Sequence, residues 1–419
     1  MVVKMSKNPN PAVVTALAIA GIMISYIMQM GPSPLLLSLR DEFGLMGQDA
    51  LLNLCVSVIF PFLIIGSVIG GFLDQRIGTS WLFILAMSLI AVGVIGNFWV
   101  TGIIEFLIFR AVFGLGFGFG VPFIGSVIMK WYGPKQRDAM TTMNGLFPFV
   151  ATLITFCLML PIARLFGNSW GTAFGFWGIL AAVILVIWML AVHRRIAPDT
   201  EATAAAPEKG IYRGLIRRKS IRILAIVFVC DFFCYSYIAT ILPTWLFELG
   251  RVSEMSAGII AAVAFPLLGL VGCGAGGLYS AKAKLRKTPL VIGQALKLIG
   301  LVAASVTVNM PIVVMGVSVY AFGNGLWMPS MYSIPTELKD MSPSRVGAAF
   351  TLMSAFGFAF GFLSPIIGGL LTEALAGLSV SALPAHVFGL RWSVFIFGFL
   401  NLLSFIFAMR ISEPVRERL

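Results

Sequence analysis

The sequence is poor in charge. Only 11% of its 419 residues are Asp, Glu, Lys or Arg, and 59% are hydrophobic, whereas about a quarter of the residues of a soluble protein are charged. This composition excludes a soluble globular chain. The sequence also has only two histidines and five cysteines, and the cysteines form no cluster with metal-ligand spacing. We therefore expect buried free thiols, no metal site and no resident cofactor.

The hydrophobic residues form long blocks instead. Segments such as 13–39, 221–247 and 394–409 carry almost no charge, and each is long enough to cross about 30 Å of hydrocarbon as a helix. Counting such blocks between charged, proline or glycine breaks gives twelve expected spans. They are 13–39, 50–73, 80–99, 101–129, 138–162, 172–193, 221–247, 255–279, 288–308, 311–333, 345–374 and 391–411. The expected fold is all-α and polytopic, embedded in a lipid bilayer.

The positive charge is distributed unevenly between the two sides of the membrane. If the N-terminus is cytoplasmic, 23 of the 29 Lys and Arg residues fall on the inner side, and four fall in outer loops. Lys and Arg accumulate in inner loops, so this distribution predicts that both termini are cytoplasmic, in a plasma membrane or a bacterial inner membrane. Orientation therefore explains the net charge of +12, and no nucleic-acid partner is expected.

The two halves of the chain resemble each other. The long polar stretch 193–220 has an Ala-, Pro- and Glu-rich middle that is typical of a flexible linker, and six spans lie on each side of it. "FPFLIIGSVIGGFLD" from Phe60 returns as "FPLLGLVGCGAGGLYS" from Phe265, and "GFGFGVP" returns as "GNGLWMP". An even number of spans preserves orientation. The sequence therefore predicts a six-helix bundle at 1–192, a cytoplasmic linker at 193–220 and a second bundle at 221–419.

One motif lies between the second and third spans. "GGFLDQRIGTS" is similar to a signature of the major facilitator superfamily of secondary transporters. Gly70 and Asp74 are in place, while Arg76 and Gly78 stand one position late. The resemblance implies a conformational switch in which Asp74 pairs with Arg76, Arg137 or a linker arginine in one state and releases it in the other. The alternative is a solvated loop acid.

Two further motifs resemble the same superfamily. The fourth span contains Arg110, Gly114 and Gly116, which are similar to its Arg-xxx-Gly-x-Gly pattern, and "KWYGPKQRDA" resembles its junction into the fifth helix. Together with the six-plus-six arrangement, the resemblance covers the whole chain. It implies two pseudo-symmetric bundles, a small-molecule substrate, alternating access and a monomer.

The stretch "RAVFGLGFGFG" alternates four glycines with bulky residues. Its spacing differs from that of a phosphate-binding loop, and it lies inside an apolar run rather than between a strand and a helix. We interpret Gly114, Gly116, Gly118 and Gly120 as a surface on which another helix packs closely.

Charged residues at membrane depth are functional candidates by default. Asp231 lies near the middle of the seventh span and is predicted to couple protons or contact substrate, with Tyr235 one turn on able to donate to it. The alternative is a structural acid. Lys297 is expected to be a structural lysine that pairs with an acid such as Asp231 or snorkels. Glu105 lies close to the outer surface, where a wetted structural role is expected.

Arg110 has two possible roles, which the sequence leaves open. It can attract an anionic substrate or assist proton movement, or it can hold Glu105 and polar groups of a neighbouring helix. Polar and aromatic residues in spans that line the superfamily's cavity complete the list of candidates, with core packing as the alternative for each. They are Tyr26, Gln29, Asn144, Asn324 and Trp327.

These observations predict a secondary active transporter, a symporter of protons with a small organic solute, with an organic anion among the candidates. No cluster of catalytic acids, bases or metal ligands is evident, so no enzyme activity and no catalytic residue are predicted. Uptake is favoured over export because "NGLFPFVATL" contains Pro148 without the Gly-Pro signature of drug exporters. A proton-driven drug or metabolite exporter and a non-transporting sensor remain the alternatives.

Overall fold

The computed structural model describes residues 11–131, 134–167, 169–193, 211–250, 252–339, 341, 343–379 and 383–413, and every regular element in these ranges is a helix. Within this described part, twelve helical segments are long and apolar enough to cross a membrane. They coincide with the twelve expected spans to within a few residues at most ends. The predicted all-α, polytopic membrane fold is confirmed.

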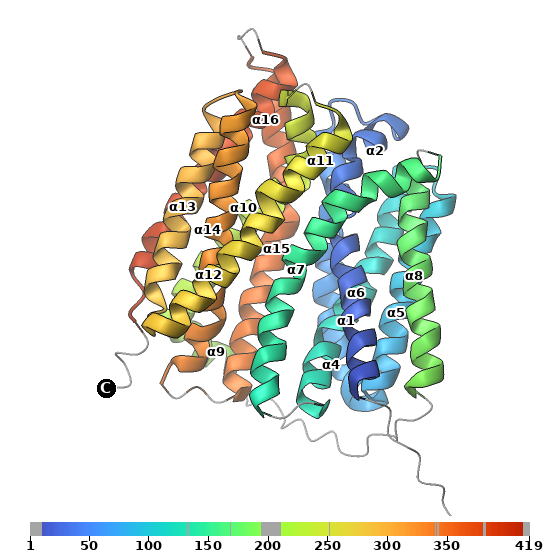
Figure 1. Cartoon of the computed structure of the whole chain (residues 1–419), viewed down its shortest axis with the longest axis vertical. Coiled ribbons are helices and arrows are strands. Elements are labelled where there is room, and N and C mark those ends of the chain that lie inside the picture. Colours follow the sequence, from blue (N-terminus) through green and yellow to red (C-terminus); the bar gives the residue numbers. More distant parts are fainter. Residues whose placement is uncertain are drawn as a thin grey trace, which may run out of the picture. The chain divides into compact units, whose positions relative to one another are not determined.

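Several spans are built from more than one helix (Figure 1). The first contains α1 (Pro11–Gln29), the 3₁₀ turn η1 (Ser33–Leu35) and α2 (Leu36–Glu42), and the second contains α3 (Asp49–Ser57) and α4 (Ile59–Ile77). The other α-helices are α5 (Thr79–Ile95), α6 (Ile103–Trp131), α7 (Pro134–Leu165), α8 (Trp170–Ala191), α9 (Ile211–Arg217), α10 (Lys219–Gly250), α11 (Glu254–Ala262), α12 (Leu268–Ala283), α13 (Lys287–Ser305), α14 (Met310–Glu337), α15 (Pro343–Ala376) and α16 (Ala385–Met409). A π-helical turn, η4 (Val263–Leu267), joins α11 to α12.

By its contacts the chain divides into two compact units. Unit 1 comprises Met1–Gly31, Val58–Ala151 and Pro161–Ala205, and unit 2 comprises Pro32–Ser57, Thr152–Leu160 and Ala206–Leu419. The boundaries predicted from the sequence follow the covalent halves on either side of the linker. Two short segments of the first half nevertheless pack with the second, and the longer of them, 32–57, contains η1, α2 and α3.

The internal repeat is visible in the packing within each unit. In unit 1, α6 packs against α4 and α5, and α5 also packs against α8. In unit 2, α14 packs against α12 and α13, and α13 also packs against α16 (Figure 1). Each helix of the first set therefore has a counterpart with the same neighbours in the second set.

Glycines allow these helices to approach closely. A Cβ atom added to Gly118 of α6 would lie 2.5 Å from the Leu63 carbonyl oxygen of α4 and 2.7 Å from Gly66 Cα. Added Cβ atoms at Gly114 and Gly116 would lie 2.7 Å and 2.8 Å from backbone oxygens of α4 and α5. Side chains of any size would separate these backbones, so three of the four glycines lie where the packing interpretation requires them.

Gly120 is a correction to that interpretation. A Cβ atom there would meet no described atom within 4 Å. Gly120 follows Gly118 by two residues, so it points about 200° around the helix and away from the contact with α4.

Gly78 has a different local function. Its backbone has φ +81°, a conformation that residues with a Cβ rarely adopt, and its N–H donates to the Asp74 carbonyl oxygen at 3.1 Å. This turn ends α4 and leads directly into α5. The position of this glycine, one residue late in the motif, therefore coincides with the residue that must terminate the helix.

We predict that Gly118→Ala destabilises the protein and that Gly120→Ala does not. Both changes gain about 1 kcal/mol of intrinsic helix propensity, but only the first forces two backbones apart, and overpacking of this kind costs about 1–3 kcal/mol or more. Thermal denaturation of the two purified variants in the same detergent measures the difference. Equal melting temperatures would show that the α4–α6 contact does not depend on this glycine.

Candidate functional site

Asp231 and Lys297 form an ion pair inside unit 2. Asp231 lies near the middle of α10 and is 4% exposed, and Lys297 of α13 is fully buried. The Lys297 ammonium donates to the Asp231 carboxylate and to Gln294 Oε1, the latter at 3.1 Å. Because burial removes hydration from both charges, each residue supplies the compensation that keeps the other inside the bundle. The expected pairing of Lys297 with Asp231 is therefore present, while the roles of both residues in transport stay predictions.

Two more helices hold the pair in place. Lys297 Nζ lies 5.9 Å from the ring centre of Tyr320 and 5.6 Å from that of Trp327, both on α14, within the range of cation–π attraction. Gln294 Oε1 also accepts a hydrogen bond from Ser404 Oγ of α16 at 2.9 Å. The protonation of one carboxylate on α10 is thereby linked to the positions of α13, α14 and α16.

Among the predicted neighbours of this centre, Tyr235 is oriented differently from expectation. Its side chain hydrogen-bonds Thr152 of α7, and its ring stacks on Phe265 of η4 with centres 5.4 Å apart. The donors to the Asp231 carboxylate are Lys297 and Trp327, and Tyr235 is not among them, so the predicted donation is not found. Asn324 is buried and accepts from Trp327 Nε1 at 3.4 Å, so these two residues lie together beside the lysine.

Arg110 caps a broken helix in unit 1. The last carbonyls of a helix have no partner within it, and α1 ends at Gln29, before the chain turns at residues 30–32. The Arg110 guanidinium donates to the Met28 and Gln29 carbonyl oxygens at 2.6 Å and 3.0 Å. A cation at a helix C-terminus is also favoured by the helix dipole. Arg110 is 1% exposed, and it therefore stabilises a helix end inside the membrane-spanning segment Val13–Glu42.

This geometry decides one of the alternatives for Arg110. Glu105 is exposed, and its carboxylate accepts from the Thr101 backbone N–H at 2.8 Å and from Thr101 Oγ1 at 3.1 Å. The suggestion that Arg110 holds Glu105 is therefore wrong, because the carboxylate stays at the start of α6. The other part of that suggestion, contact with polar groups of a neighbouring helix, is met by backbone carbonyls of α1.

The remaining candidates of unit 1 lie as follows. The Tyr26 ring packs edge-on against Phe117 with centres 5.1 Å apart. Gln29 is buried, and it is its backbone oxygen that Arg110 contacts. The side chain of Asn144 falls outside the described part of the chain.

The switch motif is only partly described. Gly70 is buried in α4, Asp74 is half-buried in its last turn, and Arg76 is exposed. The side chain of Arg137 and linker residues 194–210 lie outside the described part. The ion pair expected for Asp74 with these groups therefore stays a prediction.

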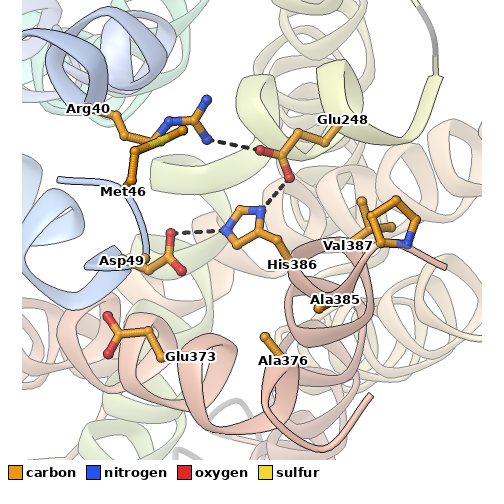
Figure 2. Close-up of a pocket in the computed structure, with 11 residues that line it drawn as sticks. Arg40, Met46, Asp49, Glu248, Glu373, Ala376, Ala385, His386 and Val387 are labelled. Carbon is orange, nitrogen blue, oxygen red and sulfur yellow. Dashed lines mark hydrogen bonds and ion pairs between the residues drawn. The ribbon is translucent and has the colours of Figure 1, made fainter. Parts of the chain in front are cut away.

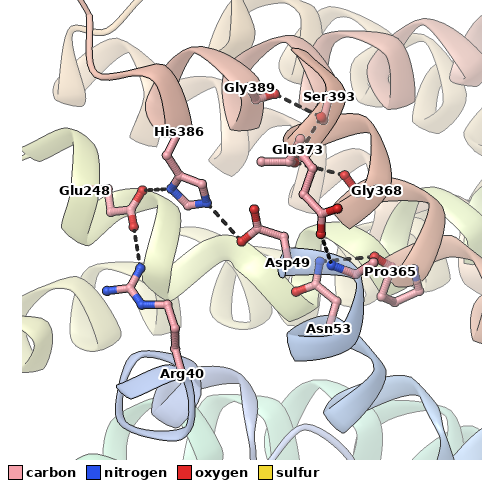
Figure 3. Close-up of polar contacts among 12 residues, drawn as sticks. Arg40, Asp49, Asn53, Glu248, Pro365, Gly368, Glu373, His386, Gly389 and Ser393 are labelled. Atoms are coloured by element: carbon pink, nitrogen blue, oxygen red, sulfur yellow. Dashed lines mark hydrogen bonds and ion pairs between the residues drawn. The ribbon is translucent and has the colours of Figure 1, made fainter. Parts of the chain in front are cut away.

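A second charged cluster lies in unit 2 at span ends predicted to face outward (Figure 2). Glu248, near the end of α10, accepts from Arg40 Nη1 of α2 at 3.2 Å through one oxygen and contacts His386 Nδ1 of α16 through the other. His386 Nε2 lies 3.0 Å from Asp49 Oδ1 of α3. The four side chains form a continuous row in which basic and acidic residues alternate, which Figure 3 shows from another direction.

The cluster borders an open pocket of about 590 Å³. Glu373 of α15 also lines it, and this carboxylate accepts from the Ala50 backbone N–H at 2.8 Å. Nearby, Asn53 Nδ2 donates to the Pro365 carbonyl oxygen at 3.1 Å (Figure 3). The segment 32–57 is thus attached to α10, α15 and α16 through polar contacts as well as packing.

Sequence reasoning did not find this cluster. Its contacts join residues 138 to 337 positions apart, so no local spacing reports it. The available signal was compositional. The sequence has only two histidines, and one of them, His386, lies in the expected outer loop between the spans 345–374 and 391–411.

Comparison with known proteins identifies the class. A family model described as Major Facilitator Superfamily matches residues 18–365. The chain belongs to the major facilitator superfamily of membrane transporters.

Two curated relatives are transporters of sugars or sugar acids. The hexuronate transporter of Bacillus subtilis (strain 168) is 26% identical over 292 residues, which cover 66% of this chain and 65% of that protein. The arabinose-proton symporter of the same organism is 26% identical over 145 residues, 33% of this chain and 31% of that protein. The matched stretches thus span less than two thirds of either relative.

Solved structures of transporters share the fold. A bacterial homologue of the human lysosomal transporter Spinster, in an inward-facing and unoccupied conformation, aligns with a TM-score of 0.79 at 16% identity and covers 97% of this chain and 96% of that one. A D-xylose-proton symporter aligns with a TM-score of 0.78 at 19% identity and covers 96% and 98%. At these identities the likeness shows the fold alone.

We predict that Asp231 and Lys297 are energetically coupled. Asp231→Asn and Lys297→Met should each lower the free energy of unfolding by about 3–5 kcal/mol, because each leaves one buried charge without its partner. The double variant should lose less than the sum of the two single losses, because it leaves no charge unpaired. Thermal or denaturant unfolding in detergent completes the cycle, and strictly additive losses would contradict the pairing.

Proposed function

We propose that this protein is a proton-coupled symporter that takes up a small sugar-type anion, such as a hexuronate, by alternating access. The observation that carries the proposal is the buried Asp231–Lys297 ion pair on α10 and α13. Membership of the transporter superfamily and similarity to a hexuronate transporter and an arabinose-proton symporter support it. The proposed location is the cytoplasmic membrane of a bacterium, with both termini inside.

The ion pair supplies a means of coupling. A proton that binds Asp231 neutralises the carboxylate and leaves the Lys297 ammonium as an uncompensated charge in a region of low dielectric. Such a charge is costly, and an anionic solute entering the transport pathway offsets it. Proton and anion therefore favour each other's binding, and the pair together adds no net charge to the protein. This reciprocity is what symport requires.

The balance of buried charge also favours an anionic solute. In the described chain, the charged side chains buried away from span ends are Arg110, Lys297 and Asp231. Two cations against one acid give these spans a net positive charge when Asp231 is ionised, and that charge becomes more positive when it is protonated. A carboxylated sugar is attracted by both states, whereas a cationic drug is repelled by both.

We predict that proteoliposomes containing the protein accumulate labelled glucuronate or galacturonate when the interior is alkaline. Asp231→Asn should abolish accumulation driven by the pH gradient but retain exchange of labelled for unlabelled solute, because the variant mimics a permanently protonated carboxylate. Glu105→Gln is the matched control, since it removes an exposed carboxylate bound only at the start of α6, and it should behave as the unaltered protein.

The alternatives give different results in the same assay. A symporter specific for neutral sugars would accumulate arabinose or xylose in place of the uronates. A proton-driven drug exporter would accumulate cationic compounds when the interior is acidic. A sensor would bind solute without transporting it. Gradient-driven accumulation that survives in Asp231→Asn would remove Asp231 from the coupling mechanism.

A further inference from the structure

The segment 32–57 is bound to unit 2 although the chain joins it to unit 1 at both ends. It continues α1 on one side and precedes α4 on the other. Ser33 Oγ donates to the Ala239 and Thr240 carbonyl oxygens of α10, at 2.8 Å each, and α3 packs along α15. In a transporter that alternates between two states, this segment must leave α10 and α15 if it moves with α1 and α4.

The row Arg40–Glu248–His386–Asp49 holds the segment at its polar edge. Arg40 and Asp49 belong to the segment, while Glu248 and His386 belong to α10 and α16 (Figures 2 and 3). The side chains of Glu248 and Asp49 are only 14% and 12% exposed. Partial burial reduces screening by solvent and salt, so these contacts are stronger than ion pairs on an open surface.

His386 makes the row dependent on a proton. An ionised carboxylate only accepts hydrogen bonds, and both ring nitrogens of His386 face carboxylate oxygens, one of Glu248 and one of Asp49. Both contacts are hydrogen bonds only when both nitrogens carry hydrogen, which is the imidazolium form. The row is then neutral, with two cations and two anions. Loss of the proton removes one hydrogen bond and leaves a net negative charge.

The other charged groups around the histidine do not provide the link between Glu248 and Asp49 that the protonated ring provides. Arg40 of α2 reaches Glu248 on the oxygen opposite the histidine, and Glu373 of α15 is engaged with the Ala50 backbone N–H. Asp41 is exposed and contacts Arg40 from outside the row, at 3.5 Å. Among the residues that the structure describes, only the imidazolium links the anion of α10 to the anion of α3.

We propose that Arg40, Glu248, His386 and Asp49 form a proton-binding lock that holds the segment 32–57 on α10 and α16. The lock is strong while His386 is protonated and weakens when it loses the proton. By linkage, attachment of the segment takes up a proton at His386, and its release gives up that proton. This site is separate from Asp231, and it depends neither on the identity of the solute nor on the proposed symport.

A buried reporter tests the lock. Ser33 is fully buried against α10, so Ser33→Cys reacts slowly with a membrane-impermeant maleimide added outside until the segment separates. Met46 lies in the same segment and is 69% exposed, so Met46→Cys reports the intrinsic reactivity of a thiol at each pH. The measured quantity is the labelling rate of Ser33→Cys divided by that of Met46→Cys in proteoliposomes. Labelling of the chain without either reporter is first subtracted from both rates.

We expect Glu248→Gln to raise this ratio about tenfold or more, as the loss of charge-assisted hydrogen bonds on both sides of the residue implies. Asp41→Asn, which removes an exposed carboxylate outside the row, should leave the ratio unchanged. With the intact lock the ratio should rise as the external pH is raised through the deprotonation of His386. His386→Gln should give a high ratio at every pH.

His386→Lys separates the lock from simple loss of fold. Lysine retains its positive charge after the imidazolium has lost its own, so this variant should keep the ratio low at alkaline pH, where the unaltered chain has opened. A ratio that is independent of pH in the unaltered chain, or equal in the His386→Gln and His386→Lys variants, overturns the proposal. So does labelling of Ser33→Cys that occurs only from the inside.

Discussion

Inside a bilayer there is no water to hydrogen-bond a stranded polar group, and this constraint organises the molecule. The carboxylate of Asp231 stays within α10 because Lys297 meets it, and the lysine in turn relies on Gln294 and the rings of α14. The end of α1 lies within a membrane span because Arg110 supplies donors to its carbonyls. In each case a group that hydrocarbon would reject is compensated by a side chain from a different helix. Moving any of these helices therefore has an electrostatic cost, which a proton or a solute can change.

The two halves share their close helix contacts but not their buried charges. Gly66 and Gly118 bring α4 and α6 together, and Gly272 and Gly276 do the same for α12 and α14. About 206 residues before Asp231 and Lys297, however, stand Ser25 and Ala91, so the first half has no equivalent ion pair. The buried ion pair is thus a place where the halves depart from each other, whereas the glycine contacts are common to both.

The sequence was informative wherever a signal is local or scarce. Hydrophobic blocks located the spans, glycine spacing identified α6 as a helix on which another packs closely, and rarity alone singled out Asp231 and Lys297. The partners of Arg110 could not be predicted, because backbone carbonyls have no signature and the break after Gln29 depends on tertiary packing. Tyr235 was misassigned because spacing on α10 cannot show that its ring stacks on Phe265. The row through His386 joins three distant parts of the chain, the segment 32–57, α10 and α16, and only the fold brings them together.

The break at residues 30–32 has a consequence for the ancestry and the engineering of this fold. A duplication produces two covalent halves that meet at the linker, yet the unit that contains the second half also includes 32–57 from the first. The boundary of the repeat and the boundary between the packed units are therefore different, and the latter crosses three spans, Val13–Glu42, Asp49–Ile77 and Gly145–Leu165. A chimera of two relatives spliced at the linker would set this segment from one parent against α10, α15 and α16 from the other. Compatible parents would have to match along that surface, however well their separate halves fold.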